Sequence, residues 1–245
     1  MITKNFKITI EYDGTSYCGW QIQKNETTVQ GVLKKSLENI VKKESVNIIG
    51  SGRTDSGVHA LGQVFNVKLE TTMTQIQIVK AMNSTLPKDI RVISCEIVED
   101  KFNARFSALN REYVYKIKKS SSAFDYNHYW NYPYEYEIEI LKECAQAVLK
   151  QKNFYNFCRP SPDIENYNCT IYHSDWMIDN DILSYRVNAN RFLHHMVRML
   201  VGTMLEVSRG KILTSDFLDL FETNTNKKRV LTAPSKGLYL LKVNY

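Results

Sequence analysis

Apolar and polar side chains alternate at the start of the chain in a way that predicts strands separated by helices. Alternate residues from Phe6 to Tyr12 are apolar, which is typical of a half-buried strand. A helix with apolar residues at helical spacing follows, beginning at a Thr27 or Thr28 cap and ending near Val41. The remaining pattern of this half predicts strands at Val46–Ile49 and Gln63–Leu69, a helix at Thr74–Ser84 and a strand at Ile90–Val98. Its element order is therefore β-α-β-β-α-β.

The second half repeats this order. It predicts a strand at Arg111–Lys118, a helix at about Glu137–Gln151, a hairpin of Cys169–Trp176 and Ile182–Asn188, a long helix at Phe192–Arg209 stopped by Gly210, a short helix at Ser215–Thr223 and a strand at Gly237–Tyr245. We therefore predict an α+β fold. Two ferredoxin/RRM-like β-α-β-β-α-β halves, residues 1–108 and 109–245, would lie with their antiparallel sheets side by side and an active-site cleft between them.

Composition and charge narrow the function only a little. With 245 residues, 43% of them hydrophobic, the chain is large enough for a packed core. A net charge of +6 favours an anionic partner. The cysteines are odd in number, widely spaced and without a CxxC pair, so we predict mostly buried, reduced thiols and no disulfide framework (Cys18, Cys95, Cys144, Cys158 and Cys169).

The hydrophobic pattern also bears on location. Charged residues interrupt each apolar stretch before the ~20 residues that a membrane span needs. The N-terminal segment MITKNFKITIEYDG lacks the basic-then-apolar order of a signal peptide. We therefore expect a cytoplasmic protein that has no membrane partner.

The segment GSGRTDSGVHALGQ, residues 50–63, is the strongest candidate for a functional loop. A P-loop ends in Gly-Lys-Ser/Thr and opens a helix, whereas this loop lacks the lysine and precedes a strand. An aspartic protease needs two aspartates that share a proton, but Asp55-Ser56-Gly57 occurs once and Arg53 favours the charged carboxylate. The phosphatase-like Glu11-Tyr12-Asp13-Gly14 has its first acid on the polar side of a strand, and its last two residues are typical of a turn.

The histidines do not predict a metal site. Asp55 and His59 are near in sequence, but the other histidines (His128, His173, His194 and His195) show no ligand spacing. His194 and His195, adjacent on the predicted helix, would point about 100° apart. We expect His59 to be a loop residue that hydrogen-bonds to backbone.

The residues alone do not decide between two interpretations of Arg53 and Asp55. In the first, Arg53 keeps Asp55 ionised as a nucleophile or general base, and Gly50, Gly52 and Gly57 let a nucleotide approach the backbone closely. In the second, the two charges form a pair that only ties the loop together.

Longer motifs resemble the tRNA pseudouridine synthase A family. They are YDGTSYCGWQIQ and TVQGVLKKSL (12–37), GRTDSGVHALGQV (52–64), LPKDIRV and FNARFSALNREYVY (86–115), RFLHHMVRMLVGTMLEV (191–207) and APSKGLYLLKVNY (233–245). They cover nearly the whole chain in the family's order, which favours the first interpretation. The resemblance implies an isomerase that converts uridine to pseudouridine. This reaction involves no redox change or energy input and needs no cofactor or metal.

The resemblance also implies roles for individual residues. Asp55 is the catalytic aspartate and attacks either C6 of the base or C1′ of the ribose. Arg53 holds that carboxylate and fills the space that the flipped base leaves. Tyr113 packs on the uracil and helps to remove the C5 proton, although the residues alone favour an inward strand tyrosine. Arg198, about one and a half turns into the predicted helix, reaches the cleft or the RNA backbone.

The implied substrate is tRNA, modified at positions 38, 39 or 40 of the anticodon stem-loop by a homodimer. Basic residues suit phosphate contact (Lys34, Lys35, Lys42, Lys43, Arg111, Lys116, Lys118, Lys119, Lys227, Lys228 and Arg229). The aromatic rings of the loop 119–136 either pack under the loop, which is the commoner arrangement, or stack on bases. Asn153 and Asn168-Cys169-Thr170 depart from the family pattern and put RNA contacts near them in doubt. The competing class is an RNA-binding module in which Arg53 and Asp55 are structural.

Overall fold

The computed structural model describes residues 3–120, 122–162, 164–222 and 230–245, and the chain divides into two compact units. The first contains Met1–Leu109 and Tyr239–Tyr245, and the second contains Asn110–Leu238. This division lies one residue from the predicted boundary between 108 and 109. It differs for the final strand, which the sequence assigns to the second half. That strand, β9 (Leu238–Asn244), pairs in parallel with the start of a strand of the first unit.

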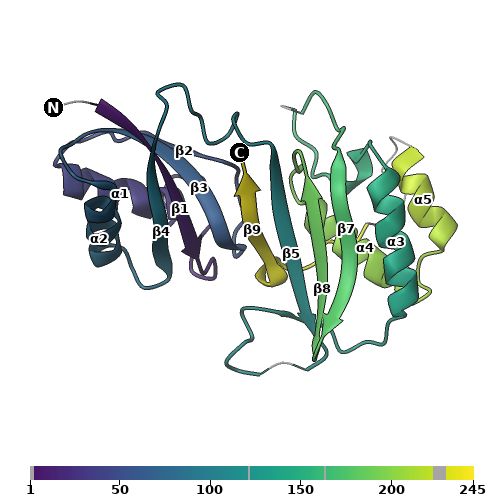
Figure 1. The fold of residues 1–245 in the computed structure, drawn as a ribbon. Coiled ribbons are helices and arrows are strands. Elements are labelled where there is room, and N and C mark those ends of the chain that lie inside the picture. The colour runs from purple at the N-terminus through teal and green to yellow at the C-terminus, as the bar shows by residue number, and fades with distance from the viewer. Residues whose placement is uncertain (1–2, 121, 163, 223–229) are drawn as a thin grey trace. The chain divides into compact units, whose positions relative to one another are not determined.

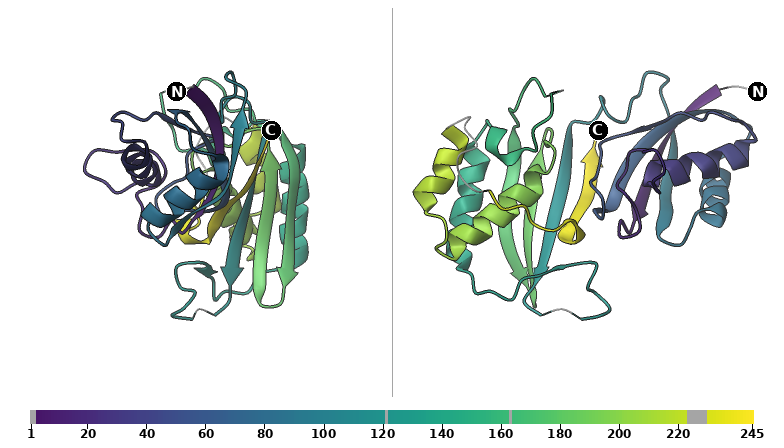
Figure 2. Two further views of the ribbon diagram at one scale, coloured as in Figure 1. Left: turned by 60° about the vertical axis from the view of Figure 1, so that its left-hand side comes forward. Right: turned by 180° about the vertical axis from the view of Figure 1, so that it is seen from behind.

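The first unit combines strands with two helices that lie on one face of them (Figures 1 and 2). Its elements are β1 (Thr3–Tyr12), α1 (Val29–Val41), β2 (Ile48–Gly50), β3 (His59–Glu70), α2 (Gln75–Thr85) and β4 (Ile90–Val98). The central strand β1 runs antiparallel to both β3 and β4, and β2 pairs with β3. The predicted alternation is confirmed, because Phe6, Ile8 and Ile10 are fully buried.

The second unit has the strand order β5-β8-β7. Its elements are β5 (Asn110–Lys118), β6 (Trp130–Asn131), α3 (Ile138–Lys150), η1 (Tyr155–Phe157), β7 (Ile171–Asp179), β8 (Ile182–Ala189), α4 (Met196–Ser208), α5 (Thr214–Glu222) and η2 (Ser235–Gly237). The long strands are antiparallel, while the short β6 runs parallel to β5. Helix α3 packs on β7 and against α4. Mixed α+β structure is thus present in both units.

The structure corrects the predicted start of the long helix. Helix α4 begins at Met196 rather than at Phe192, because His195 has a left-handed backbone with φ of 65°. His194 and His195 therefore precede the helix, and their ring centroids lie 4.2 Å apart instead of diverging. Gly210 follows the helix with φ of 70°, in agreement with its predicted role as a stop.

Other predictions concern the ends of elements and the presence of membrane-spanning helices. Strand β3 begins at His59, four residues before the predicted start. The predicted helix end at Thr223 and the basic residues Lys227, Lys228 and Arg229 lie outside the described residues. None of the helices in the described ranges has the length and apolar character needed to span a lipid bilayer.

All five cysteines are free, as predicted, and three of them are buried. Burial raises the pKa of Cys144 to about 12 and that of Cys169 to about 11. These thiols therefore stay protonated and unreactive at neutral pH.

Candidate active site

Asp55 lies in the loop between β2 and β3, next to loop residues that are buried. Burial alternates along it, so that Ser51 and Thr54 are buried, Arg53 is exposed and Asp55 is half-buried. Asp55 is therefore partly exposed to solvent, while the residue immediately before it is buried in the first unit.

Buried hydrogen bonds from β1 and β3 fix this loop. The hydroxyl groups of Tyr12 and Thr54 lie 2.8 Å apart, and burial raises the pKa of Tyr12, which stays a neutral phenol. The Ser51 hydroxyl donates to Gln63 Oε1 at 2.6 Å, and Gln63 Nε2 donates to the carbonyl of Gly52 at 3.2 Å. The backbone is thus held on both sides of the arginine by side chains from the sheet.

The segment after β1 supports the loop through its backbone. The N–H of Trp20 donates to the carbonyl of Thr54 at 3.1 Å, and the N–H of Gly57 donates to that of Tyr17 at 3.2 Å. Gly19 allows this approach, because a Cβ there would lie 2.6 Å from the Thr54 carbonyl oxygen, and its φ is +82°. The motif YDGTSYCGW therefore forms a brace for the loop that carries Asp55.

The glycines of the loop do not share one purpose. Gly50 lies beneath Trp20, whose indole atoms would be 2.6 Å from an added Cβ, so packing rather than nucleotide access requires a glycine there. Gly57 has φ of 73°, in the turn closed by the hydrogen bond from Val58 N–H to the Asp55 carbonyl. An added Cβ at Gly52 would meet no atom within 4 Å, so this glycine faces open space.

Arg53 and Asp55 differ in their exposure to solvent. Among the residues that the structure describes, no ion pair joins the two, and Arg53 is exposed. An exposed guanidinium is well solvated and gains little from a surface ion pair. Hydrogen bonds from Tyr12, Gln63 and Trp20 hold the loop.

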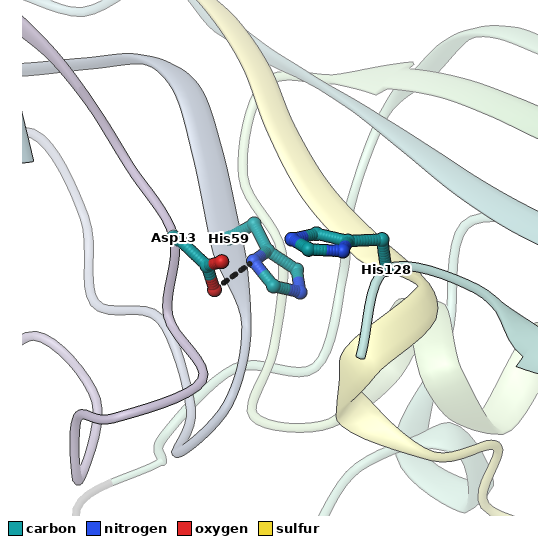
Figure 3. A group of neighbouring side chains, drawn as sticks. All are labelled: Asp13, His59 and His128. Carbon is teal, nitrogen blue, oxygen red and sulfur yellow. Dashed lines mark ion pairs between the residues drawn. The ribbon is translucent and has the colours of Figure 1, made fainter. Parts of the chain in front are cut away.

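His59 is not a loop residue but the buried first residue of β3. Its Nδ1 lies 3.1 Å from both the Gly14 amide nitrogen and Asp13 Oδ1 (Figure 3). A neutral Nδ1 accepts from Gly14, as predicted for a histidine bound to backbone, whereas a protonated Nδ1 donates to Asp13. The ring also stacks on Tyr239 at 4.7 Å.

Tyr113 lies on β5 and belongs to the second unit. Its backbone is opposite Val187 of β8, its side chain is 9% exposed, and its ring meets Phe192 edge-on at 5.0 Å. This is the inward strand tyrosine that the residues alone predict.

Arg198 is the third residue of α4, within the first turn, rather than one and a half turns into a helix. Its Nε donates to the carbonyl of Ala233 at 2.8 Å, and the N–H of Ala233 returns a bond to the carbonyl of Arg198 at 3.0 Å. The next carbonyl, of Pro234, accepts from the Tyr115 hydroxyl at 2.7 Å. The guanidinium is therefore held at a fixed place within the second unit.

Comparison with known proteins decides the family. A sequence model described as tRNA pseudouridine synthase matches residues 8–107 and 145–245. The chain belongs to the tRNA pseudouridine synthase family. It is 37% identical to tRNA pseudouridine synthase A of Geobacillus sp. (strain WCH70), over 100% of this chain and 99% of that protein. It is 39% identical to the synthase of Thermoanaerobacter sp. (strain X514), over 99% and 100%. The chain is thus an isomerase that converts uridine to pseudouridine.

The two matched ranges divide the candidate residues of this synthase. Arg53, Asp55 and the residues that support them fall in the first range, and Arg198 falls in the second. Tyr113 and the loop 119–136 lie between the ranges. Asp55 belongs to one compact unit, and Tyr113 and Arg198 belong to the other.

The sequence pattern identified the loop of this synthase but not the residues that support it. Tyr12 looked like an ordinary inward strand residue, and Gln63 like the first residue of a strand. A signal for Gln63 was present, because a fully buried amide among apolar strand residues must find hydrogen-bond partners.

We predict that the hydroxyl groups of Tyr12 and Thr54 stabilise the synthase only when both are present. Tyr12→Phe leaves the buried Thr54 hydroxyl without this partner and should cost about 1–3 kcal/mol of unfolding free energy, as should Thr54→Val. The double variant should lose less than the sum, because neither group is then left unsatisfied. Urea unfolding of the four proteins measures the coupling, and strictly additive losses would show that the bond contributes nothing.

Proposed function

We propose that this synthase isomerises uridine in tRNA, with the Asp55 carboxylate as the nucleophile. The observation that carries the proposal is the loop geometry: a half-buried aspartate follows a residue that is bonded through both its hydroxyl and its carbonyl. Such a fixed backbone limits the positions that the carboxylate can sample, which favours attack on a bound base. Family membership supplies the reaction.

The proposed chemistry needs only groups of the protein and the RNA. Asp55 attacks C6 of the uracil or C1′ of the ribose, and the bond between N1 and C1′ breaks. The uracil turns, C5 bonds to C1′, and the carboxylate leaves again. The C5 proton is then lost and N1 is protonated, so the product is an isomer of the substrate and no redox partner takes part.

The other candidate residues have roles that suit their surroundings. We propose that Arg53, whose side chain is exposed, fills the space of the flipped base rather than holding the carboxylate. Tyr113 packs on the uracil and helps to remove its C5 proton. Arg198 contacts the RNA backbone or the reacting group, and its bond to Ala233 supports this role because it fixes the guanidinium beforehand.

Further parts of the proposal rest on the resemblance. The substrate uridines are at positions 38 to 40 of the anticodon stem-loop, and the protein acts in the cytoplasm as a homodimer. We also propose that the halves are of ferredoxin-like type. In the first unit this is supported by the strand order β4-β1-β3, with β2 on the outer side of β3.

The nucleophile can be tested by tritium release from tRNA labelled at C5 of uridine. Asp55→Ala should lower the rate at least about 10³-fold, because no other group replaces the attacking carboxylate. The matched control is Ser56→Ala, which removes only the hydroxyl of an exposed neighbour and should keep activity. Release by Asp55→Ala at the wild-type rate would leave the competing class, an RNA-binding module, as the better description.

The role of Arg53 has its own test. Arg53→Ala should retain tRNA binding but lose about 10²-fold in rate on a uridine within a stem, because the flipped base is no longer replaced. The loss should shrink on an oligonucleotide in which the uridine is unpaired. Arg53→Lys keeps the charge without the planar fork and should not restore the rate. An equal loss on both substrates would instead point to a role in chemistry.

The homodimer is tested by light scattering at micromolar concentration. The expected mass is twice the 28.5 kDa of one chain. A mass of one chain, with tritium release intact, would contradict the dimer and leave the nucleophile assignment in place.

A further inference from the structure

The loop 122–136 of the second unit presents aromatic rings to solvent. Phe124 is 96% exposed, Tyr126 57% and Tyr134 51%. Aromatic side chains have large apolar faces that folding usually buries, so the Phe124 ring is an available stacking surface, whereas Arg209 lies 4.0 Å from the centre of the Tyr134 ring. The loop lies between the two ranges that match the family, so the matched part of the chain does not account for it.

The tip of this loop is held in a defined turn. Asp125 accepts from the backbone N–H of Ser122 at 2.9 Å and from Lys118 Nζ at 2.8 Å, and its own carbonyl accepts from the N–H of His128 at 2.9 Å. Lys118 lowers the pKa of Asp125, which stays ionised at neutral pH. The exposed ring of Phe124 therefore projects from a fixed turn, and a partner that stacks on it loses little backbone entropy.

A cation lies beside these rings. Lys236 Nζ is 3.5 Å from the centre of the Tyr126 ring. Lys118 and Lys119 are neutralised by acidic neighbours, whereas in the described part of the chain no acidic side chain pairs with Lys236. An exposed ring next to an unneutralised ammonium suits the flat base and the charged phosphate of one nucleotide. A second copy of this chain, which carries a net charge of +6, suits that charge less well.

We propose that the turn 122–128 and Lys236 form an RNA contact in addition to the site of reaction. Phe124 stacks on an unpaired base of the substrate, and Lys236 beside Tyr126 contacts a phosphate. This inference rests on the proposed tRNA substrate, and it adds a place on the protein where bases other than the reacting uridine are bound.

Binding of an unmodified tRNA transcript to the full chain, measured by fluorescence anisotropy, tests the stacking. Phe124→Ala should weaken binding by about 5- to 150-fold, which is the range for one base–aromatic stack. Phe124→Trp should bind as the wild type does, while Phe124→Leu, apolar but without a ring face, should not. The matched control is Tyr172→Ala, a ring 56% exposed on β7, which should leave binding unchanged.

Salt dependence separates the two parts of the contact. Lys236→Gln should reduce the slope of log Kd against log salt by about one, while Phe124→Ala should keep the slope of the wild type. Wild-type affinity in Phe124→Ala, full binding by Phe124→Leu, or an equal loss in Tyr172→Ala would each overturn the proposal. A shift in mass of Phe124→Ala by light scattering would assign the turn to a second copy instead. Because binding is measured without turnover, a wild-type protein that binds tRNA but releases no tritium would refute the proposed function and not this contact.

Discussion

The hydrogen bonds that converge on Thr54 are the constraint on which the candidate site depends. Its hydroxyl meets Tyr12, and its carbonyl accepts from Trp20, so one residue is held from β1 and from the segment after it. Asp55 is the next residue, and the bonds of Thr54 fix the backbone from which its side chain extends. The bonds that hold this part of the backbone are made by atoms other than the Asp55 carboxylate.

Close packing explains why glycine is needed at Gly14, Gly19 and Gly50. An added Cβ would lie 2.0 Å from the Val58 carbonyl oxygen at Gly14, 2.6 Å from the Thr54 oxygen at Gly19, and 2.6 Å from the Trp20 indole at Gly50. At Gly14 and Gly19 the backbones of two segments far apart in sequence thus pack directly on each other, whereas at Gly50 the close neighbour is the Trp20 side chain. Without such packing, the amides of one segment could not reach the carbonyls of the other.

Local pattern predicted most elements, while non-local contacts decided what it missed. The burial of alternate residues in β1 and the helical spacing in α1 are properties of short windows, and both were found. The start of α4 was misplaced because Leu193 fits the apolar spacing although His195 has a left-handed backbone. In the site, charge on a glycine loop singled out Asp55. Its supports were not predicted, because an inward tyrosine or glutamine takes its role from partners that only the fold supplies.

The pairing of β9 with β3 has a consequence for how the protein is made. Residues His59 and Ala60, just after the loop of Asp55, find their parallel partners in Tyr239 and Leu240. During synthesis the first unit therefore waits with an open strand edge until almost all of the second unit has left the ribosome. The edge of β3 at His59 is thus covered only after the second unit has been synthesised, while the loop of Asp55 receives its hydrogen bonds from residues made earlier.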